Sequence, residues 1–430
     1  MKHSFRIIIG MLLFAIPLCL NAQVNPKKNN DKKPKEKVEQ GESFRQGKAK
    51  ATPLEETEKG STDQMQPNKP EKPIMLDGKG SKGGNDWMPK ISGFVQGLYQ
   101  ADVNGDGELS NTFRLRRVRL SVDGTLFKGL TYKIQGDFSR SPMLVDAYLK
   151  YKVCNEFAIQ VGQFKTPFSI ESPINPVNLE IFDYGEGIQK LVGYSDVCGV
   201  GGLGRDIGLM ATGKLFPVEG EEGIKYHVVD YALGVFNGNG PTTTDNNNRK
   251  DIVGRLEVHP GLKDLTLSGS YYYGLYRNTT VENQIETNGI AAGKTAFPNG
   301  VRNRWAAGIQ YNDGKLVLRG EYISGQTGYK IGGLDENGDA LIIDDILNSK
   351  GYYAVAGYNF ALGKDKSQKL MPVLRYEHFD QLMEGTNWYT FGINYWPIKS
   401  LNFKFDYSLI INGIDDIKGH RIVGILSYKF

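Results

Sequence analysis

The sequence predicts an all-β protein, a transmembrane antiparallel β-barrel of sixteen strands with one loop folded into its interior. Three observations support this prediction. From residue 87 onward, segments of about ten residues alternate apolar and polar positions, the pattern of strands with one apolar face. The connections between them tend to be short and long in turn. The 53 Gly, 23 Tyr and 20 Phe among 430 residues suit strands and tight turns rather than helices.

Residues 1–22 have the pattern of a secretory signal peptide. Lys2 and Arg6 precede an apolar core, and Leu20-Asn21-Ala22 is a small-residue cleavage site, so we expect cleavage after Ala22. Residues 23–86 are rich in Lys and Pro and poor in aromatic residues, which predicts a disordered periplasmic leader. The barrel would then occupy residues 87–430.

The charge distribution argues against a nucleic-acid partner. Lys and Arg outnumber Asp and Glu by 52 to 48 over the whole chain. The signal peptide contributes +2 and the leader +3 (14 basic, 11 acidic residues), so the remainder carries −1 (36 basic, 37 acidic). A globally basic surface is therefore absent from the predicted barrel, and any preference for anions must come from local placement.

Sixteen segments between Lys90 and Phe430 fit the strand pattern. In the last but one, Phe403, Phe405 and Tyr407 share one face, with Lys404 and Asp406 on the other. The predicted strands are 90–101, 112–123, 129–139, 143–153, 156–164, 206–216, 225–236, 249–259, 264–276, 301–311, 315–324, 350–361, 369–380, 386–396, 400–410 and 419–430.

The connections separate by length. Short turns such as Asp313-Gly314 follow even-numbered strands, whereas long connections (102–111, 165–205, 237–248, 277–300, 325–349) follow odd-numbered ones. Short turns at one end, long loops at the other and a C-terminal Phe430 are typical of an outer-membrane barrel. Closure of the barrel gives the backbone N–H and C=O groups of every strand a hydrogen-bond partner within lipid. A barrel of sixteen strands also encloses an aqueous lumen. Lipids of the bacterial outer membrane are thus the expected surroundings.

An arginine-rich strand is the most distinctive segment. In Phe113-Arg-Leu-Arg-Arg-Val-Arg-Leu120 the alternation slips by one residue between Arg116 and Arg117. A β-bulge would keep all four guanidiniums facing the lumen; alternatively, one of them sits at the membrane rim. Lipid-facing Arg at mid-depth costs about 2–4 kcal/mol, so most of the four must point inward.

Alternation places further basic groups on the lumen face. Rings or ladders of such groups select anions in pores. Inward acidic residues are also predicted, so a salt-bridge network that merely stiffens the wall is an equal alternative. The candidate anion-binding groups of the pore wall are Arg114, Arg116, Arg117, Arg119, Lys133, Lys150, Arg255, Arg319 and Lys404.

Residues 165–205 are the longest irregular stretch after the leader. A connection of this length is seldom an idle surface loop. We expect it to fold into the lumen and narrow it, with Lys165, Lys190 and Arg205 lining the constriction. A flap on the surface is the alternative.

The chain resembles the phosphate-selective porin O and P family. The resemblance is carried by the arginine-rich strand, by Tyr132-Lys-Ile-Gln-Gly-Asp-Phe138, by Asp146-Ala-Tyr-Leu149 and above all by Val161-Gly-Gln-Phe-Lys-Thr-Pro-Phe-Ser169. It covers about residues 90–430 and is specific over 90–210. The resemblance implies a sixteen-stranded, homotrimeric outer-membrane channel for small anions such as phosphate or polyphosphate. The leader is similar to those of Bacteroidetes members.

Other chemistry is weakly supported. Asp102-Val-Asn-Gly-Asp-Gly107 matches the first half of a calcium loop, but Phe113 stands where the twelfth-position acid is needed, so we expect a surface turn and no metal or cofactor. The four His residues after the signal peptide are scattered, and none adjoins a nucleophile, so an outer-membrane hydrolase is the least favoured function. A structural or adhesive barrel without an open channel remains the other alternative.

Overall fold

The computed structural model describes residues 88–219, 225–261, 264–276, 300–334, 340–363, 366–381, 384–413 and 418–430. The predicted signal peptide and leader lie outside these residues. The described chain is mostly strand, with one 3-10 turn, η1 (Pro176–Asn178), and one short helix, α2 (Glu186–Leu191). Among the described residues, no helix is both long enough and apolar enough to cross a membrane.

The strands lie close to the predicted segments. They are β1 (Lys90–Val103), β2 (Leu109–Phe127), β3 (Leu130–Asp137), β4 (Leu144–Lys152), β5 (Ala158–Lys165), β6 (Arg205–Glu219), β7 (Lys225–Phe236), β8 (Asp251–Val258), β9 (Leu265–Tyr276), β10 (Gly300–Asn312), β11 (Leu316–Leu334), β12 (Ala340–Tyr358), β13 (Phe360–Leu362), β14 (Gln368–Gln381), β15 (Glu384–Ile398), β16 (Leu401–Asn412) and β17 (Lys418–Lys429).

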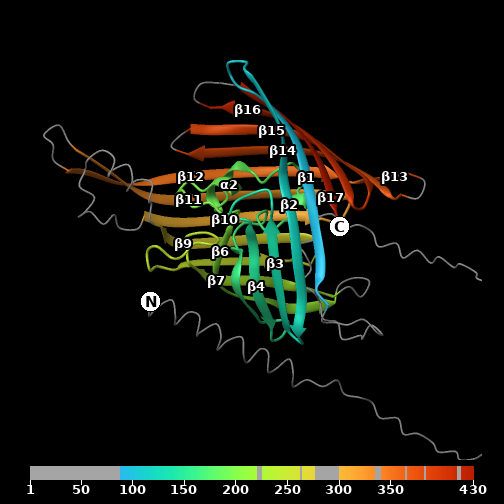
Figure 1. Cartoon of the computed structure of the whole chain (residues 1–430), viewed down its shortest axis with the longest axis horizontal. Coiled ribbons are helices and arrows are strands. Elements are labelled where there is room, and N and C mark those ends of the chain that lie inside the picture. Colours follow the sequence, from blue (N-terminus) through green and yellow to red (C-terminus); the bar gives the residue numbers. More distant parts are fainter. Residues whose placement is uncertain are drawn as a thin grey trace, which may run out of the picture. The chain divides into compact units, whose positions relative to one another are not determined.

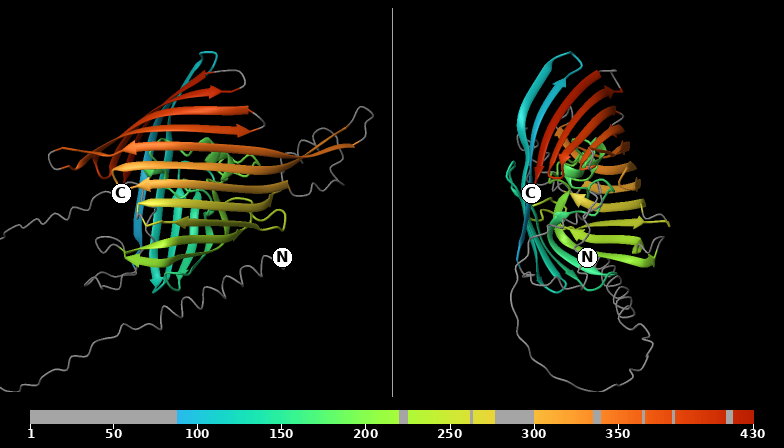
Figure 2. Two further views of the ribbon diagram at one scale, coloured as in Figure 1. Left: turned by 180° about the vertical axis from the view of Figure 1, so that it is seen from behind. Right: turned by 90° about the vertical axis from the view of Figure 1, so that its right-hand side faces the viewer.

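These strands close into one antiparallel barrel (Figures 1 and 2). Each strand pairs with its neighbours in the chain, and β1 closes the sheet by pairing with both β2 and β17. β12 and β13 form one barrel strand, because both pair with β14 and only Asn359 separates them. The barrel therefore has sixteen strands, as predicted, and closure leaves no strand at the edge of an open sheet.

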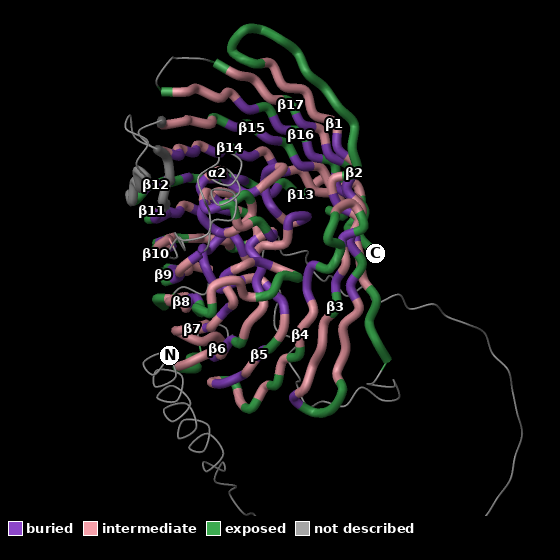
Figure 3. The backbone as a smooth tube through the Cα atoms, turned by 60° about the vertical axis from the view of Figure 1, so that its left-hand side comes forward, coloured by how far each residue is buried: buried purple, intermediate pink, exposed green. Residues whose placement is uncertain are grey.

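The two faces of the wall differ as the alternation predicts. On β16, Phe403 and Phe405 are 44% and 47% exposed on the outside, whereas Lys404 and Asp406 are 3% and 1% exposed on the inside. Figure 3 shows buried and exposed positions alternating along the strands. The outer face therefore presents aromatic and aliphatic side chains to lipid, and the inner face holds most of the charged groups.

The short turns form as predicted at the Asp-Gly pair. Gly314 has a φ of 92°, and the Asp313 side chain accepts hydrogen bonds from the backbone N–H groups of Lys315 and Leu316 at 2.8 and 2.7 Å. A residue without a Cβ is needed at that φ, which is why this dipeptide sets the hairpin.

Two regions differ from the predicted boundaries. The expected irregular loop 325–349 is largely a hairpin, because β11 continues to Leu334 and β12 starts at Ala340, and the two strands pair along that whole length. β2 begins at Leu109 but β3 reaches only Asp137, so in the β2–β3 ladder the described pairing starts at Arg119. Residues 109–115 of β2 thus form a strand edge without a ladder partner on the β3 side, whereas the carbonyls of Arg116 and Val118 accept hydrogen bonds from Ser139 Oγ and from the Phe138 N–H group.

Candidate functional site

The segment between β5 and β6, residues 166–204, lies inside the barrel, and we call it the inner loop. Ser169 N–H donates to Ser270 Oγ of β9 at 3.1 Å. From another part of the wall, Asn394 Nδ2 of β15 donates to the carbonyl of Glu180 at 2.6 Å. Because β9 and β15 are distant from β5 around the barrel, the loop crosses the lumen, as Figure 3 also shows for α2. The prediction of an inward-folded loop is confirmed.

Lys165, the last residue of β5, binds the first half of the inner loop. Its Nζ donates to the carbonyls of Ser172 and Ile174 at 2.5 and 3.1 Å and to the Tyr184 hydroxyl at 3.0 Å. The ammonium also lies 5.2 Å from the centroid of the Tyr184 ring. The prediction that Lys165 lines the constriction is therefore corrected: three oxygens of the loop satisfy its donors, and the side chain holds the turn in place.

Apolar side chains of the inner loop pack on one part of the wall. Phe168, Ile188 and Leu191 are at most 1% exposed. They belong to a core that includes inward residues of β7 to β14, among them Phe236, Val253, Val317, Ile323, Val355 and Val373. These inward positions were expected to line water. They are apolar because the inner loop, rather than solvent, covers them, and burial of this surface holds the loop in the barrel.

Carboxylates of the inner loop pair with arginines of the wall. Asp196 binds Arg304, with one contact at 2.6 Å, and Glu180 binds Arg319 at 2.5 Å. Glu171 binds Arg375, and Asp183 binds both Arg116 and Arg117. The loop contains five acidic residues and one Lys, so it is an acidic segment held by a basic wall.

The charge state of the loop follows from these pairs. Burial alone raises the pKa of a carboxyl group, but the facing guanidiniums outweigh burial here. The pKa values of Glu180, Asp183 and Asp196 consequently lie below their ordinary ones. All three carboxyls are therefore ionised at neutral pH.

The arginine-rich strand contains the β-bulge that the sequence suggested. In the β1–β2 ladder, Gln96 faces Arg117 and Gly97 faces Leu115, so Arg116 is the extra residue. Phe113 and Leu115 stay on the outside at 81% and 63% exposure. Arg116 and Arg117 can therefore both reach Asp183 in the lumen, an arrangement that strict alternation forbids.

The other predicted site residues separate into groups. Arg319 is fully buried against Glu180, and Arg205 binds Asp146 at 2.8 Å, so neither faces an open lumen as predicted; each is bound to a buried carboxylate. Other predicted pore-wall and constriction groups also bind atoms of the protein itself. Lys404 donates to the Leu179 carbonyl, Arg119 binds Asp137 at 2.9 Å, Arg255 reaches the Ser169 carbonyl at 3.2 Å, and Lys190 lies 3.7 Å from Glu186 within α2.

A second set of cations lies on the wall from β2 to β6, and we call it the cationic stripe. It comprises Arg114, Lys133, Arg140, Lys150 and Lys214. The Arg114 side chain is exposed and donates to Gln100 Oε1 at 3.1 Å, and the described chain brings no carboxylate into contact with it. The sheet register places Lys133 opposite Tyr148 and Lys150 opposite Thr131 on neighbouring strands.

Sequence reasoning missed two members of the stripe, Arg140 and Lys214, and two buried arginines of the wall, Arg302 and Arg304. Lys214 and Arg302 occupy inward positions that the alternation of their own strands indicates. Arg140 lies in the β3–β4 turn, where no periodic pattern exists, and the folded turn brings it near Asp137, Arg117 and Arg205. Lys214 pairs with Asp230 at 2.7 Å, with 39% of its side chain exposed.

The calcium-like segment behaves as a polar turn. Asn104 Oδ1 accepts the backbone N–H groups of Asp106 and Glu108 at 3.1 and 2.8 Å. Among the described residues, no group of three or more His, Cys, Asp or Glu side chains is arranged to hold a metal ion.

Comparison with known proteins gives a family and a fold. The family model of phosphate-selective porin O and P matches residues 90–412. The barrel is similar to an anion-selective porin from Comamonas acidovorans, at 13% identity and a TM-score of 0.54, covering 80% of this chain and 99% of that one. OmpF of Salmonella typhi in complex with daunomycin matches at 13% identity, a TM-score of 0.49 and coverage of 80% and 98%. No curated protein matches the sequence.

Proposed function

Because the chain belongs to the phosphate-selective porin O and P family, we propose that this outer-membrane porin conducts small anions by passive diffusion, phosphate and polyphosphate among them. The family and the closed sixteen-stranded barrel support a channel rather than an enzyme. Signal-peptide cleavage after Ala22 is part of the same proposal, because the barrel must be exported to reach the outer membrane.

One observation carries the preference for anions: the cationic stripe adjoins the part of the lumen that the inner loop does not cover with apolar side chains. On β2, β3 and β4, only Tyr148 contributes to the loop's apolar core. The other inward residues there are mostly polar or charged, and Thr131, Lys133 and Lys150 among them are partly exposed. Water therefore has a polar wall to follow on this side, and fixed ammonium and guanidinium groups raise the local concentration of anions.

Replacing Arg114 and Lys150 by Gln should lower the anion preference of the channel. At about 8 Å in water, one unit charge changes the energy of a passing ion by about 0.5 kcal/mol, and about 0.1 M salt roughly halves this effect by screening. Each of the two charges acts on chloride and potassium with opposite sign, so the chloride-to-potassium permeability ratio of the double variant should fall by the equivalent of about 1 kcal/mol, or about fivefold. The reversal potential in a planar bilayer under a KCl gradient measures this ratio. Lys350→Gln is the control, since that side chain is 56% exposed at the rim beside Asp380. An unchanged ratio in the double variant would show that the stripe is structural.

The alternative of a barrel without an open channel is favoured by one observation, the extent to which the inner loop is buried within the lumen. The same bilayer recordings separate the two functions, because a plugged barrel gives no conductance steps. If conductance steps occur but phosphate does not reduce the chloride current, the channel conducts small anions without a preference for phosphate, and the phosphate part of the proposal is wrong.

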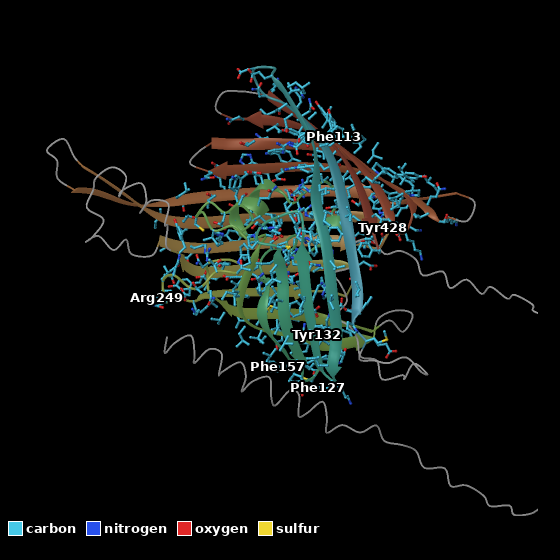
Figure 4. The ribbon with its side chains drawn as sticks, in the orientation of Figure 1. Phe113, Phe127, Tyr132, Phe157, Arg249 and Tyr428 are labelled. Atoms are coloured by element: carbon cyan, nitrogen blue, oxygen red, sulfur yellow. The ribbon has the colours of Figure 1, made fainter. Side chains whose placement is uncertain are left out.

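We also propose that the channel is a homotrimer and that copies meet at β1, β2 and β17. Residues 109–115 of β2 form a strand edge without a ladder partner on the β3 side, and Phe113, labelled in Figure 4, lies on it at 81% exposure. A groove of about 630 Å³ lies next to it on the wall, where Gly97 and Gly424 leave space that a Cβ would not fill. Unpaired backbone groups are costly in lipid, so a second copy of the chain is the fitting partner.

Filling this groove should weaken the trimer. Gly97→Trp places a large ring where a neighbouring copy would pack, and we expect a shift from trimer to monomer in detergent, measured by light scattering after size exclusion. Leu256→Trp is the matched control, because Leu256 is 49% exposed on the outside of β8. A wild-type protein that is already monomeric, or a Gly97 variant that stays trimeric, would contradict the proposed interface.

A further inference from the structure

The tip of the inner loop, Phe182-Asp183, packs against the wall at β1, β2 and β17, and we call the side chains that surround it the pocket. The Asp183 carboxylate binds Arg116 through one oxygen and Arg117 through the other, the second contact being 3.1 Å. The Phe182 ring lies between two guanidiniums, 5.3 Å from Arg116 and 5.9 Å from Arg421. The chain's own side chains thus place an aromatic ring and a carboxylate together in this pocket.

The pocket has an apolar floor and a basic rim. Leu98, Val423 and Ile425, which contact Phe182, are 3%, 1% and 4% exposed. The rim is ordered before any solute arrives, because Arg421 is held by Asp102 at 2.5 Å and lies 5.2 Å from the Trp388 ring. A flat apolar surface flanked by planar cations favours a flat anion, because stacking and charge pairing are satisfied at once.

The charge balance shows how the tip affects the pocket. Five cationic side chains come from the surrounding strands: Arg114, Arg116, Arg117, Lys404 and Arg421. Three carboxylates face them, Asp102 from β1, Asp406 from β16 and Asp183 from the loop itself. If the tip moves away, five cations face two carboxylates, and a solute anion can take the place of Asp183.

The tip is also the most accessible of the loop's anchors. The Asp183 side chain is 18% exposed, whereas those of Glu171, Glu180 and Asp196 are at most 1% exposed. The neighbouring Arg114 is exposed to the lumen. A solute can therefore compete with the tip while the three deeper anchors keep the rest of the loop in place.

We infer that this pocket binds planar organic anions, aromatic carboxylates in particular, and that Phe182-Asp183 is a resident ligand which such solutes displace. The inference rests on the proposed anion conduction and narrows its substrate class. The solute's ring takes the position of Phe182 between Arg116 and Arg421, and its carboxylate takes the position of Asp183.

The wild-type channel tests this inference by competition against chloride. Benzoate, cyclohexanecarboxylate and acetate carry the same charge, but only benzoate has a planar ring. In planar bilayers, benzoate should halve the chloride current at about one tenth of the acetate concentration, the factor that ~1.4 kcal/mol of cation–π stacking supplies. Cyclohexanecarboxylate should be weaker than benzoate. Equal block by benzoate and acetate would overturn the inference.

Two variants test the role of the tip. Asp183→Asn removes the resident carboxylate, so the half-blocking benzoate concentration should fall about tenfold further. Arg421→Gln removes one of the two guanidiniums near the ring and should reduce the difference between benzoate and acetate. Asp245→Asn, the same change in the β7–β8 connection, should alter neither. An Asp183 variant that binds benzoate no better than wild type would refute the resident-ligand role.

A binding measurement in detergent keeps the inference testable if conductance changes for other reasons. Benzoate should alter the tryptophan emission of the full-length wild-type protein but not that of Trp388→Phe, and an identical response in both would count against the pocket.

Different results would reject the two proposals, anion conduction and the pocket for planar anions. Absence of a chloride preference in the reversal potential rejects anion conduction, whereas a chloride preference with equal benzoate and acetate block rejects only this pocket.

Discussion

Replacing Arg319 by Gln should release the inner loop and increase the conductance of the channel severalfold. Arg319 is buried between two loop carboxylates, with Nη2 at 2.5 Å from Glu180 and 3.6 Å from Glu171. Removing one partner of a buried ion pair leaves an uncompensated charge, which costs about 3–5 kcal/mol. The loop can avoid that cost by leaving the wall. Single-channel conductance and the protease sensitivity of residues 166–204 measure the release.

The double variant Arg319→Gln with Glu180→Gln tests whether ion pairing or apolar packing holds the inner loop on the wall. It removes both charges while the amide groups retain a hydrogen bond, so conductance and protease resistance should return most of the way to wild type. Lys350→Gln serves as the exposed control, because the loss of a surface pair changes stability by at most about 1 kcal/mol. If the single Arg319 variant conducts like wild type, the apolar core alone holds the loop.

Acid should detach the inner loop while the barrel remains closed. The pKa values of Glu180, Asp183 and Asp196 are lowered in the folded protein, so their ion pairs contribute stability above the ordinary carboxyl pKa values. That contribution is lost as the pH falls from these ordinary values, 4.5 for Glu and 3.8 for Asp, through the lower folded ones. Conductance recorded from pH 7 down to about pH 2 should therefore rise below about pH 4.

The barrel itself provides the reference for the acid experiment. Its strand ladders are backbone hydrogen bonds and do not titrate, so far-UV circular dichroism should stay constant across the same range. Glu180→Gln should shift the rise in conductance toward higher pH, because one anchor is already neutral. A conductance that is constant between pH 7 and pH 2 would show that the loop carboxylates do not hold the loop.

The residues themselves explain why the barrel could be predicted so closely. A strand in lipid has one apolar and one polar face at a period of two, and each hairpin is local, so the pattern around Phe403, Lys404 and Phe405 is visible without any partner strand. The bulge at Arg116 could be read from the slip in that pattern. The inward direction of the loop followed from its length and position alone.

The site was predicted less well, for a physical reason. Alternation indicates which way a side chain points, but it does not show what the side chain meets there. Arg319 was assigned to the pore wall, and Arg205 and Lys165 to the constriction. Arg319 and Arg205 instead bind carboxylates distant in sequence, and Lys165 binds oxygens of the inner loop. The loop's carboxylates carry no periodic signal that pairs them with particular arginines.

The sequence alone determined a closed cylinder of sixteen strands, its apolar exterior and the inward direction of most arginines of the arginine-rich strand. The tertiary structure decided which of those arginines bind the carboxylates of the inner loop. Strand patterning is a local property of each segment, whereas pairing across the lumen depends on where the loop comes to rest. That position is set by the fit of Phe168, Leu191 and the loop carboxylates to walls formed by strands far along the chain.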